Sequence, residues 1–328
     1  MPDAIRIRGV TKTFGPKVAV NNLDLSIPEG GIYGFIGPNG AGKTTTIRMI
    51  MSIYFPDRGE ISVLERKSAV ESKDRIGYLP EERGIYRKMR VGGFLEYMAK
   101  LKGVPSAEAS KRVKIWLERV GLSDTIRKRC QELSKGMQQK VQFLSAIMHE
   151  PDLVILDEPF SGLDPVNARL MRELIHGLEG EGKTIIFSTH VMQHAEQICD
   201  HVFMINRGAK VLDASLADIH ARFDPKSVLV EPVRGSDTTV LRTIPGVASV
   251  TQAPRSTALE LMLSDGAEPV GVLKAVVSAL PVTKVQVRRA SLEDIFIDLV
   301  QRDGRGESVE ALRAALRDET PAQEVPGA

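Results

Sequence analysis

The chain has 328 residues, of which 42% are hydrophobic and 26% charged, so it is long enough for two globular domains. Its net charge of +2 provides no overall positive field for binding nucleic acid or an anionic membrane. The only cysteines, Cys130 and Cys199, exclude a disulfide framework and are expected to be small buried side chains in a reducing compartment. The sequence has no secretory signal pattern and no apolar stretch long enough to span a bilayer, so we expect a cytoplasmic protein.

Residues 1–224 alternate short β-branched segments with helical patterns. The expected strands lie at residues 5–14, 19–27, 31–37, 152–159, 184–190 and 201–208, and the expected helices at 43–54, 165–180 and 190–200. Apolar strands separated by helices predict an α/β domain with a parallel sheet covered on both faces. The segment 89–149 has only helical patterns, so we expect a helical subdomain inserted into this domain.

A different pattern begins near residue 225. Strands are expected at 227–233, 247–253, 258–264 and 282–289, with helices at 238–244 and 269–280 between them. For residues 225–301, this β-α-β-β-α-β order predicts a small α+β accessory domain of ferredoxin-like topology, closed by a helix from Ser291. No cluster of titratable residues there indicates catalysis, so we expect a regulatory or dimer-contacting role. Residues 302–328 are expected to form a flexible tail with at most one short helix.

A glycine-rich motif lies between an expected strand and an expected helix. The stretch GPNGAGKT satisfies the P-loop pattern G-x-x-x-x-G-K-[ST]. Its glycines would allow backbone N–H groups to approach phosphate oxygens, and the helix N-terminus adds positive potential. Lys43 would bridge the terminal phosphates and the Thr44 hydroxyl would bind Mg²⁺, whereas the alternative is a glycine-rich turn with an exposed lysine. The residues expected to bind the nucleotide here are Gly37, Pro38, Asn39, Gly40, Ala41, Gly42, Lys43, Thr44 and Thr45.

Two acidic residues end another expected strand. In LVILDEP, four apolar residues place Asp157 and Glu158 at the carboxyl end of a central strand, where ligands of open α/β sheets bind. Asp157 is expected to hold Mg²⁺, directly or through water, and Glu158 to polarise a water molecule for attack on the γ-phosphate. By itself, the pair could equally cap a strand, but the upstream P-loop favours the catalytic interpretation.

A second helix start is suited to binding an anion. The stretch LSKGMQQK, residues 133–140, precedes the strand that ends in Asp157. Ser134 is a good N-cap residue, and together with Gly136 it leaves the helix N-terminus open to an anion. In isolation the motif indicates only a capped helix, but its position before the acidic strand favours an anion-binding role.

Together these motifs resemble those of a nucleotide-binding subunit of an ABC transporter. GPNGAGKTT is similar to the Walker A motif, LSKGM to the signature, LVILDEP to Walker B, SGLD to the D-loop, and His190 after IIFST to the switch histidine. The resemblance covers residues 4–222. It implies an ABC-type P-loop NTPase fold with ATP and Mg²⁺ as cofactors, with Phe14 stacked on adenine and His190 at the γ-phosphate.

The resemblance also implies partners. Subunits of this family form a head-to-tail dimer, here of two copies of this chain or of this chain and a second ATP-binding subunit. Each ATP would lie between the P-loop of one subunit and Ser134 and Gly136 of the other, and catalysis would use Glu158, His190 and Lys43. A separate multi-helix membrane permease would hold the subunit at the inner face of the cell membrane, and no nucleic-acid partner is expected.

Two departures from the family pattern narrow the resemblance. Glu81 in LPEERGIY stands where the Q-loop glutamine is expected, and the signature has Lys135 and Met137 in place of Gly and Gln. A carboxylate binds a hard cation at least as well as an amide oxygen, so Glu81 joins Thr44 and Asp157 as an expected Mg²⁺ ligand or sensor. The next two residues are expected to be solvated or at the permease interface. With the added C-terminal domain, the chain resembles the ATPases of sodium-efflux and drug-resistance exporters, which implies sodium or a small drug-like compound as substrate.

Three other functions are weighed against this one. A zinc site of His190, His194 and Cys199 is disfavoured because the first histidine is not followed by the glutamate of metalloproteases, and a surface role is expected for His194. A soluble ABC ATPase acting on ribosomes or nucleic acid is the main alternative, but the single cassette and the short segment between P-loop and signature argue against it. A non-hydrolysing scaffold is disfavoured by Glu158.

Overall fold

The computed structural model describes residues 2–82, 84–223, 226–253, 258–302 and 309–317. The chain divides into two compact units, one of residues 1–216 and 296–328 and the other of residues 217–295. The sequence predicted divisions near 224 and 301, where the composition changes. The divisions between the two compact units lie at 216 and 295.

The larger unit contains most of the regular structure. Helix α9 (Leu292–Arg302) crosses the second division of the chain. The strands of the larger unit are β1 (Asp3–Phe14), β2 (Lys17–Pro28), β3 (Ile32–Ile36), β4 (Arg58–Val63), β5 (Ile76–Leu79), β6 (Leu153–Asp157), β7 (Thr184–Thr189), β8 (His201–Asn206) and β9 (Ala209–Ser215). Its other helices are α1 (Lys43–Ile50), α2 (Val91–Leu101), α3 (Ser106–Arg119), α4 (Lys135–Ile147), α5 (Pro165–Gly180), α6 (Met192–Ile198) and α10 (Val309–Arg317).

A six-stranded sheet forms the centre of the larger unit, with the strand order β5-β6-β7-β3-β8-β9. Neighbouring strands are parallel except β8 and β9, which are antiparallel. Every residue of β6 and β7 is buried, as expected for central strands covered on both faces. The prediction of a parallel sheet is confirmed for the strands expected at 31–37, 152–159, 184–190 and 201–208.

The first two strands do not join this sheet, contrary to the prediction. β1, β2 and β4 form a separate antiparallel sheet of three strands. Phe14 pairs with Lys17, so only Gly15 and Pro16 connect β1 to β2. A connection this short joins antiparallel neighbours, whereas parallel strands need a crossover of a dozen or more residues.

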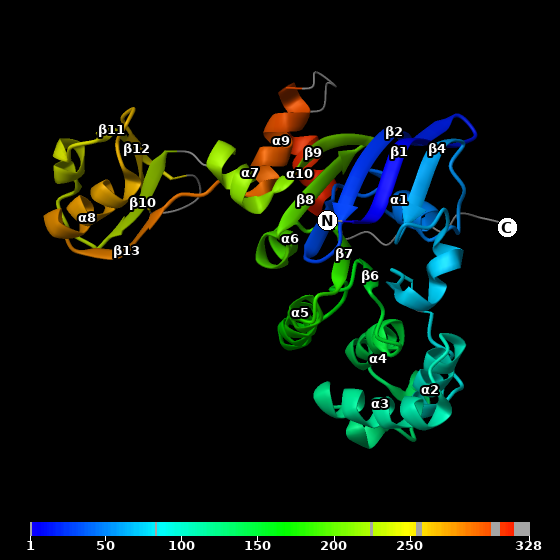
Figure 1. Cartoon of the computed structure of the whole chain (residues 1–328). Helices are drawn as coiled ribbons and strands as arrows, with labels where there is room; N and C mark the ends of the chain where they lie inside the picture. Colours follow the sequence, from blue (N-terminus) through cyan, green and yellow to red (C-terminus); the bar gives the residue numbers. More distant parts are fainter. Residues whose placement is uncertain (1, 83, 224–225, 254–257, 303–308, 318–328) are drawn as a thin grey trace. The chain divides into compact units, whose positions relative to one another are not determined.

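The segment between β5 and β6 contains α2, α3 and α4. Residues 89–149 form no strand, as the sequence predicted, although a single β-bridge joins Arg90 to Arg129. α4 contacts both α2 and β5, so it connects this helical group to the central sheet. Figure 1 shows α2, α3 and α4 gathered in the larger unit away from β1, β2 and β4.

The smaller unit contains a four-stranded sheet and helix α8 (Pro269–Ala279). The order β11-β12-β10-β13, with every neighbouring pair antiparallel, is the arrangement that β-α-β-β-α-β connections produce in a ferredoxin-like domain. Val272 and Val276 of α8 share a core with Val228 and Val230 of β10. The elements are α7 (Leu216–Phe223), which begins at the division, β10 (Ser227–Pro232), β11 (Val247–Gln252), β12 (Leu259–Leu263) and β13 (Val282–Val287).

The helix expected at 238–244 is instead a 3₁₀ segment, Thr238–Thr243, with Asp237 as its N-cap. Its residues include three threonines and one valine, and β-branched side chains lose rotamer freedom in an α-helix. At this short length a tighter 3₁₀ turn replaces the α-helix.

The last part of the chain contains the closing helix and part of the expected tail. The closing helix expected from Ser291 is α9, and the Ser291 hydroxyl oxygen accepts a hydrogen bond from the Asp294 N–H at 3.1 Å. Within the tail expected at 302–328, α10 is one short helix, and residues 303–308 and 318–328 lie outside the described residues. Among the helices that the structure describes, none is long and apolar enough to cross a membrane.

The close approach of β5 to α4 leads to a stability prediction. A Cβ at Gly77 would lie 2.2 Å from the Ala146 carbonyl oxygen, so Gly77→Ala should lower the free energy of unfolding by about 1–3 kcal/mol. Gly177→Ala in α5 is the control, because its Cβ meets nothing within 4 Å and helix propensity should raise stability by roughly 0.5–1 kcal/mol. Chemical denaturation measures both, and wild-type stability of Gly77→Ala would contradict the close packing.

Candidate functional site

The glycine-rich loop joins β3 to α1, and steric contacts require its glycines. A Cβ at Gly37 would lie 2.2 Å from the Ile205 carbonyl oxygen, and one at Gly42, with φ +110°, would lie 2.5 Å from the Ala19 carbonyl oxygen. Gly40 has φ 76°, a conformation that glycine adopts without strain. The loop is therefore shaped by close backbone packing, which a chance glycine-rich turn does not require. The other predicted binding residues of this stretch, Pro38, Asn39, Ala41, Thr44 and Thr45, lie in the same loop or in the first turn of α1.

Lys43, at the start of α1, is buried rather than exposed. Its ammonium group donates hydrogen bonds to the carbonyl oxygens of the first two loop residues at 2.7 and 3.1 Å. Burial lowers the pKa of Lys43, and the negative charges of Glu158, Asp157 and Glu81 oppose that shift. Three carboxylates from two distant parts of the sequence therefore act on one lysine.

Asp157 ends β6, and its carboxylate is buried. The Ser188 hydroxyl of β7 donates a hydrogen bond to Asp157 Oδ1 at 2.8 Å, while the buried Oδ2 accepts none from the described residues. Burial raises the pKa of Asp157 to about 6, and the Ser188 hydrogen bond opposes the shift. A buried carboxylate with an unpaired oxygen fits a hard cation such as Mg²⁺, whose charge favours the ionised form.

Glu158 has a left-handed backbone with φ 49°, which is uncommon for a residue with a Cβ. Its Oε1 accepts hydrogen bonds from the His190 backbone N–H at 2.9 Å and from His190 Nδ1 at 2.7 Å, and its Oε2 accepts one from the Thr189 hydroxyl at 3.1 Å. The hydrogen bond to Glu158 raises the pKa of His190, although burial opposes this. Strained backbone held by several hydrogen bonds is typical of active sites.

Ser188 and Thr189 are site residues that the sequence analysis did not identify. They end β7, and their hydroxyl groups bond to Asp157 and Glu158 respectively. A signal was present, because both end an apolar strand, and the carboxyl ends of parallel strands collect ligand-binding groups.

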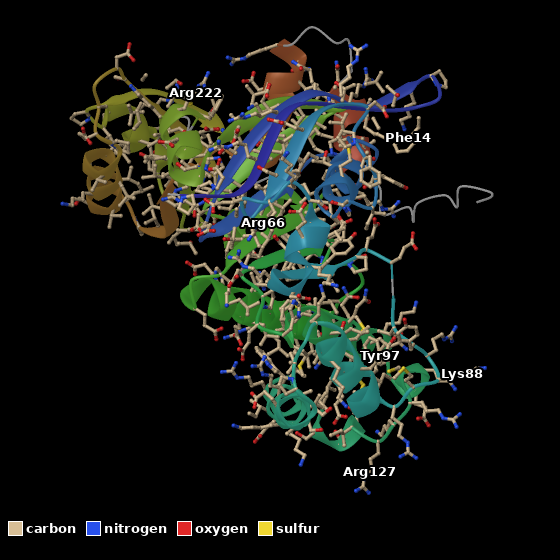
Figure 2. The ribbon with its side chains drawn as sticks, turned by 45° about the vertical axis from the view of Figure 1, so that its right-hand side comes forward. Phe14, Arg66, Lys88, Tyr97, Arg127 and Arg222 are labelled. Atoms are coloured by element: carbon tan, nitrogen blue, oxygen red, sulfur yellow. The ribbon has the colours of Figure 1, made fainter. Side chains whose placement is uncertain are left out.

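Phe14 ends β1 at the tip of the β1–β2 hairpin (Figure 2). Its side chain is 43% exposed and packs edge-on against Tyr54, with ring centroids 5.4 Å apart. The Asp57 carboxylate fastens the hairpin, because it accepts hydrogen bonds from Lys12 at 2.8 Å and from the Thr13 N–H and hydroxyl at 2.7 Å each. The Lys12 and Thr13 hydrogen bonds lower the pKa of Asp57 to about 2. The exposed ring is suited to stacking on a flat base, and no local sequence signal indicated Tyr54 or Asp57.

Ser134 caps α4, as predicted, and its hydroxyl oxygen accepts a hydrogen bond from the Met137 N–H at 3.3 Å. Gly136 lies near α5, where an added Cβ would be 3.1 Å from Asn167 Nδ2. Within one chain, α4 lies with the helical group, apart from α1 (Figure 1).

Glu81 follows β5 and is exposed. Burial is the largest cause of the raised pKa of Asp157, and the Ser188 hydrogen bond opposes it. The negative charge of Glu81 makes a smaller contribution that raises the pKa further. Glu82 is also exposed, and its Oε1 lies 3.9 Å from Arg48 Nη2. Arg83, for which the sequence predicted a solvated or interfacial position, lies outside the described residues.

The three residues weighed as zinc ligands have separate partners. His190 forms a hydrogen bond to Glu158, and the half-buried His194 ring packs on Phe160 with ring centroids 5.0 Å apart. Cys199 is buried against Gly34, so close that a Cβ added to Gly34 would lie 2.8 Å from the Cys199 sulfur. His194 therefore packs on Phe160 with one part of its ring and stays partly at the surface, where the sequence placed it. The described residues contain no group of three or more His, Cys, Asp and Glu side chains placed to hold a metal ion.

A buried lysine in a glycine-rich strand-to-helix loop, with an Asp-Glu pair at the end of a nearby parallel strand, defines a P-loop nucleoside triphosphatase. A family model described as "ABC transporter" matches residues 20–161. A second model, described as "ATP-binding protein DrrA1-3-like, C-terminal domain", matches residues 215–300.

Individual proteins agree with this class. The uncharacterized ABC transporter ATP-binding protein YhaQ of Bacillus subtilis is 40% identical over 296 residues, which cover 90% of this chain and 98% of YhaQ. The bacitracin transport ATP-binding protein BcrA of Bacillus licheniformis is 39% identical over 212 residues, covering 63% of this chain and 68% of BcrA. A solved structure of an ATP-binding subunit of an ABC transporter matches with a TM-score of 0.63 and 29% identity, covering 67% of this chain and 93% of that one. The chain belongs to the ABC transporter ATP-binding proteins, whose ATP-binding domains hydrolyse ATP.

The contact between Glu158 and His190 leads to a pH prediction. The Glu158 carboxylate raises the pKa of His190 above its usual value of 6.5. The pair therefore stabilises the fold fully when the pH is below the pKa of His190 in the unfolded chain. This stabilisation is lost as the pH rises through the pKa of His190 in the folded chain. Glu158→Gln should lower the pKa of His190, since a neutral amide stabilises imidazolium less. NMR titration of the ring protons measures this, with His149, whose pKa burial lowers to about 4, as the internal control. An unchanged pKa of His190 would contradict the contact.

Proposed function

We propose that this chain is the ATP-hydrolysing subunit of an exporter and that it drives a separate membrane permease. The observation that carries this proposal is the Glu158 carboxylate, which His190 and Thr189 hold in place, while its charge acts on the buried Lys43. A positioned base near a phosphate-binding lysine is the arrangement that hydrolysis of a terminal phosphate requires.

In the proposed mechanism, Glu158 is the general base that takes a proton from the attacking water. His190 holds the carboxylate through its ring and backbone and supplies positive charge toward the γ-phosphate. Lys43 exchanges its two carbonyl partners for phosphate oxygens. The rest of the loop, Gly37 to Thr45, binds the phosphates, and Phe14 stacks on the adenine.

Mg²⁺ would be held by Thr44 and Asp157, with Glu81 as a further ligand or a sensor. The unpaired Asp157 Oδ2 and the position of Thr44 in the first turn of α1 support this assignment. The bound ion would neutralise charge on the phosphate oxygens.

The N-terminus of α4 supports a head-to-tail dimer, because it is a second helix start that is suited to binding an anion. α4 begins at a serine cap with a glycine in its first turn, yet it lies apart from α1 within one chain (Figure 1). In a dimer of this chain with itself or with a second ATP-binding subunit, Ser134 and Gly136 would contact the ATP held by the partner's P-loop.

An exposed aromatic cluster in the helical group is the proposed permease contact. Tyr86 and Tyr97 are 52% and 42% exposed, with ring centroids 6.0 Å apart, and Leu101 is 57% exposed. Lys88, Arg127 and Tyr97 lie in the same region of the unit (Figure 2). Exposed aromatic and apolar side chains in a region that also carries basic ones suit a protein partner at an anionic membrane surface, so the subunit would bind the inner face of the membrane through its permease.

The substrate is proposed to be a drug-like compound or a peptide antibiotic. BcrA, a similar protein, is named for bacitracin transport. The match of residues 215–300 to the DrrA1-3-like domain shows that the accessory domain is shared with that group of ATP-binding proteins. Sodium, the other substrate that the sequence suggested, stays a prediction.

Replacement of the proposed base tests the enzymatic assignment. Glu158→Gln should lower ATP turnover by about 10² to 10⁴-fold while ATP still binds, because the P-loop is unchanged. Phosphate release and calorimetric titration of ATP measure the two effects. Glu173→Gln, at an exposed position of α5, is the charge-matched control and should hydrolyse ATP normally. Wild-type turnover of Glu158→Gln would refute the assignment.

Replacement of the exposed aromatic residue tests the permease contact. Tyr86→Ala should weaken association with membranes that contain the permease by about tenfold, the scale of a lost aromatic hot spot, without changing ATP binding. Ile115→Ala is the matched control, because Ile115 is 45% exposed on α3 of the same helical group. Sedimentation of the chain with native membranes measures this, and equal recovery of both variants would contradict the proposed surface.

A further inference from the structure

Gln142, on α4, makes contacts that the proposed function does not explain. Its Nε2 donates hydrogen bonds to the carbonyl oxygens of Pro80 at 3.3 Å and Glu82 at 3.0 Å. These are the residues immediately before and after Glu81. Because Gln142 is only 4% exposed, water competes little for the two bonds.

Packing alone does not account for this glutamine. Both of its N–H groups are used by carbonyl oxygens, which fixes the orientation of the amide. The amide oxygen Oε1 is buried and accepts no hydrogen bond from the described residues. A buried unpaired acceptor costs stability, and methionine, of similar length, would avoid that cost. The benefit of glutamine at this position therefore lies in the two bonds that it donates.

α4 contacts both acidic loops of the site. About one turn before Gln142, the buried Gln139 donates through Nε2 to the Pro159 carbonyl oxygen at 3.3 Å, and Pro159 directly follows Glu158. The same helix begins at the cap residue Ser134. A rigid helix thus links the loop of Glu81, the loop of Glu158 and the proposed contact to the partner's ATP.

Among the described residues, the contact from α1 to the turn around Glu81 is weak. Arg48 Nη2 lies 3.9 Å from Glu82 Oε1, and the Glu82 side chain is 90% exposed. An exposed ion pair at this distance contributes little. The hydrogen bonds from Gln142 are therefore the stronger restraint on this turn.

We propose that Gln142 is a positioning residue for ATP hydrolysis, whose two hydrogen bonds set the backbone around Glu81 and so direct the Glu81 carboxylate toward the metal and water of the site. This inference rests on the proposed role of Glu81 in the site. The helix α4, which begins within the signature motif LSKGM, would then be connected directly to the Glu81 carboxylate.

A double-mutant cycle tests the inference in the purified full-length chain. Steady-state ATP hydrolysis is measured against Mg²⁺ concentration for Gln142→Met, Glu81→Ala and the double variant. Gln142→Met should raise the Mg²⁺ concentration for half-maximal turnover about tenfold, the scale of losing such hydrogen bonds. In the Glu81→Ala background the same change should have no further effect, because nothing is left for Gln142 to position.

A second readout needs neither nucleotide nor metal. Cleavage after Glu81 by a glutamate-specific protease should be about tenfold faster in Gln142→Met, because the turn opens more readily. The melting temperature should change little, because the loss of the two donated hydrogen bonds is offset by removal of the buried unpaired acceptor. Gln138→Met is the matched control: Gln138 Nε2 donates to the carbonyl oxygens of Cys130 at 3.3 Å and Leu133 at 3.0 Å, outside the acidic loops. It should change neither cleavage after Glu81 nor the Mg²⁺ requirement.

Distinct outcomes separate the inference from the proposed function. If Gln142→Met has the same effect in both backgrounds, the inference is overturned and the role of Glu81 stands. If Glu81→Ala leaves hydrolysis and its Mg²⁺ dependence unchanged, the proposed role of Glu81 fails and the inference fails with it. A lower melting temperature with unchanged cleavage after Glu81 would show that Gln142 serves packing alone.

Discussion

The parallel pairing of β6, β7 and β3 is the constraint on which the site depends. The register places Asp157 beside Ser188, and Ile36, the last residue before the glycine-rich loop, beside Thr189. Parallel strands end at the same edge of a sheet. Asp157 and Ser188, which lie 31 residues apart in the chain, therefore meet within hydrogen-bonding distance at this edge. The glycine-rich loop, more than a hundred residues earlier in the chain, starts beside the end of β7.

Burial at this edge determines the chemistry of the assembled groups. Removing charges from water is costly unless opposite charges and hydrogen bonds compensate. Here burial lowers the pKa of Lys43 and raises the pKa of Asp157 to about 6, and each group opposes the shift of the other. The strained backbone of Glu158 persists because its carboxylate is held on both oxygens. The packing that holds these groups in position therefore also removes their charges from water, which costs free energy.

Helix α4 connects the carboxyl edge of the parallel sheet, where the site lies, to the helices α2 and α3. α4 contacts the helical group at α2 and the central sheet at β5, and its glutamines bond to the loops after β5 and β6. A movement of α4 would therefore be transmitted to both acidic loops. Small shifts of a packed helix are a known means by which sites are switched, and in an exporter the same helix would lie between the permease contact and the hydrolysis site.

The sequence by itself determined the class of the protein and the chemistry of its main groups. Spacing and periodicity were enough to recognise three segments, because local backbone requirements specify their residues. These are the loop GPNGAGKT, the strand LVILDEP and the helical segment without strands. Local patterns did not separate the β1–β2 hairpin from the parallel sheet, nor did they indicate that the segment at 238–244 forms a 3₁₀ turn. Only the tertiary structure assigned Ser188, Thr189 and Gln142 to the site. Their roles follow from strand register and from a buried helix face, and both are set by contacts between residues distant in the chain.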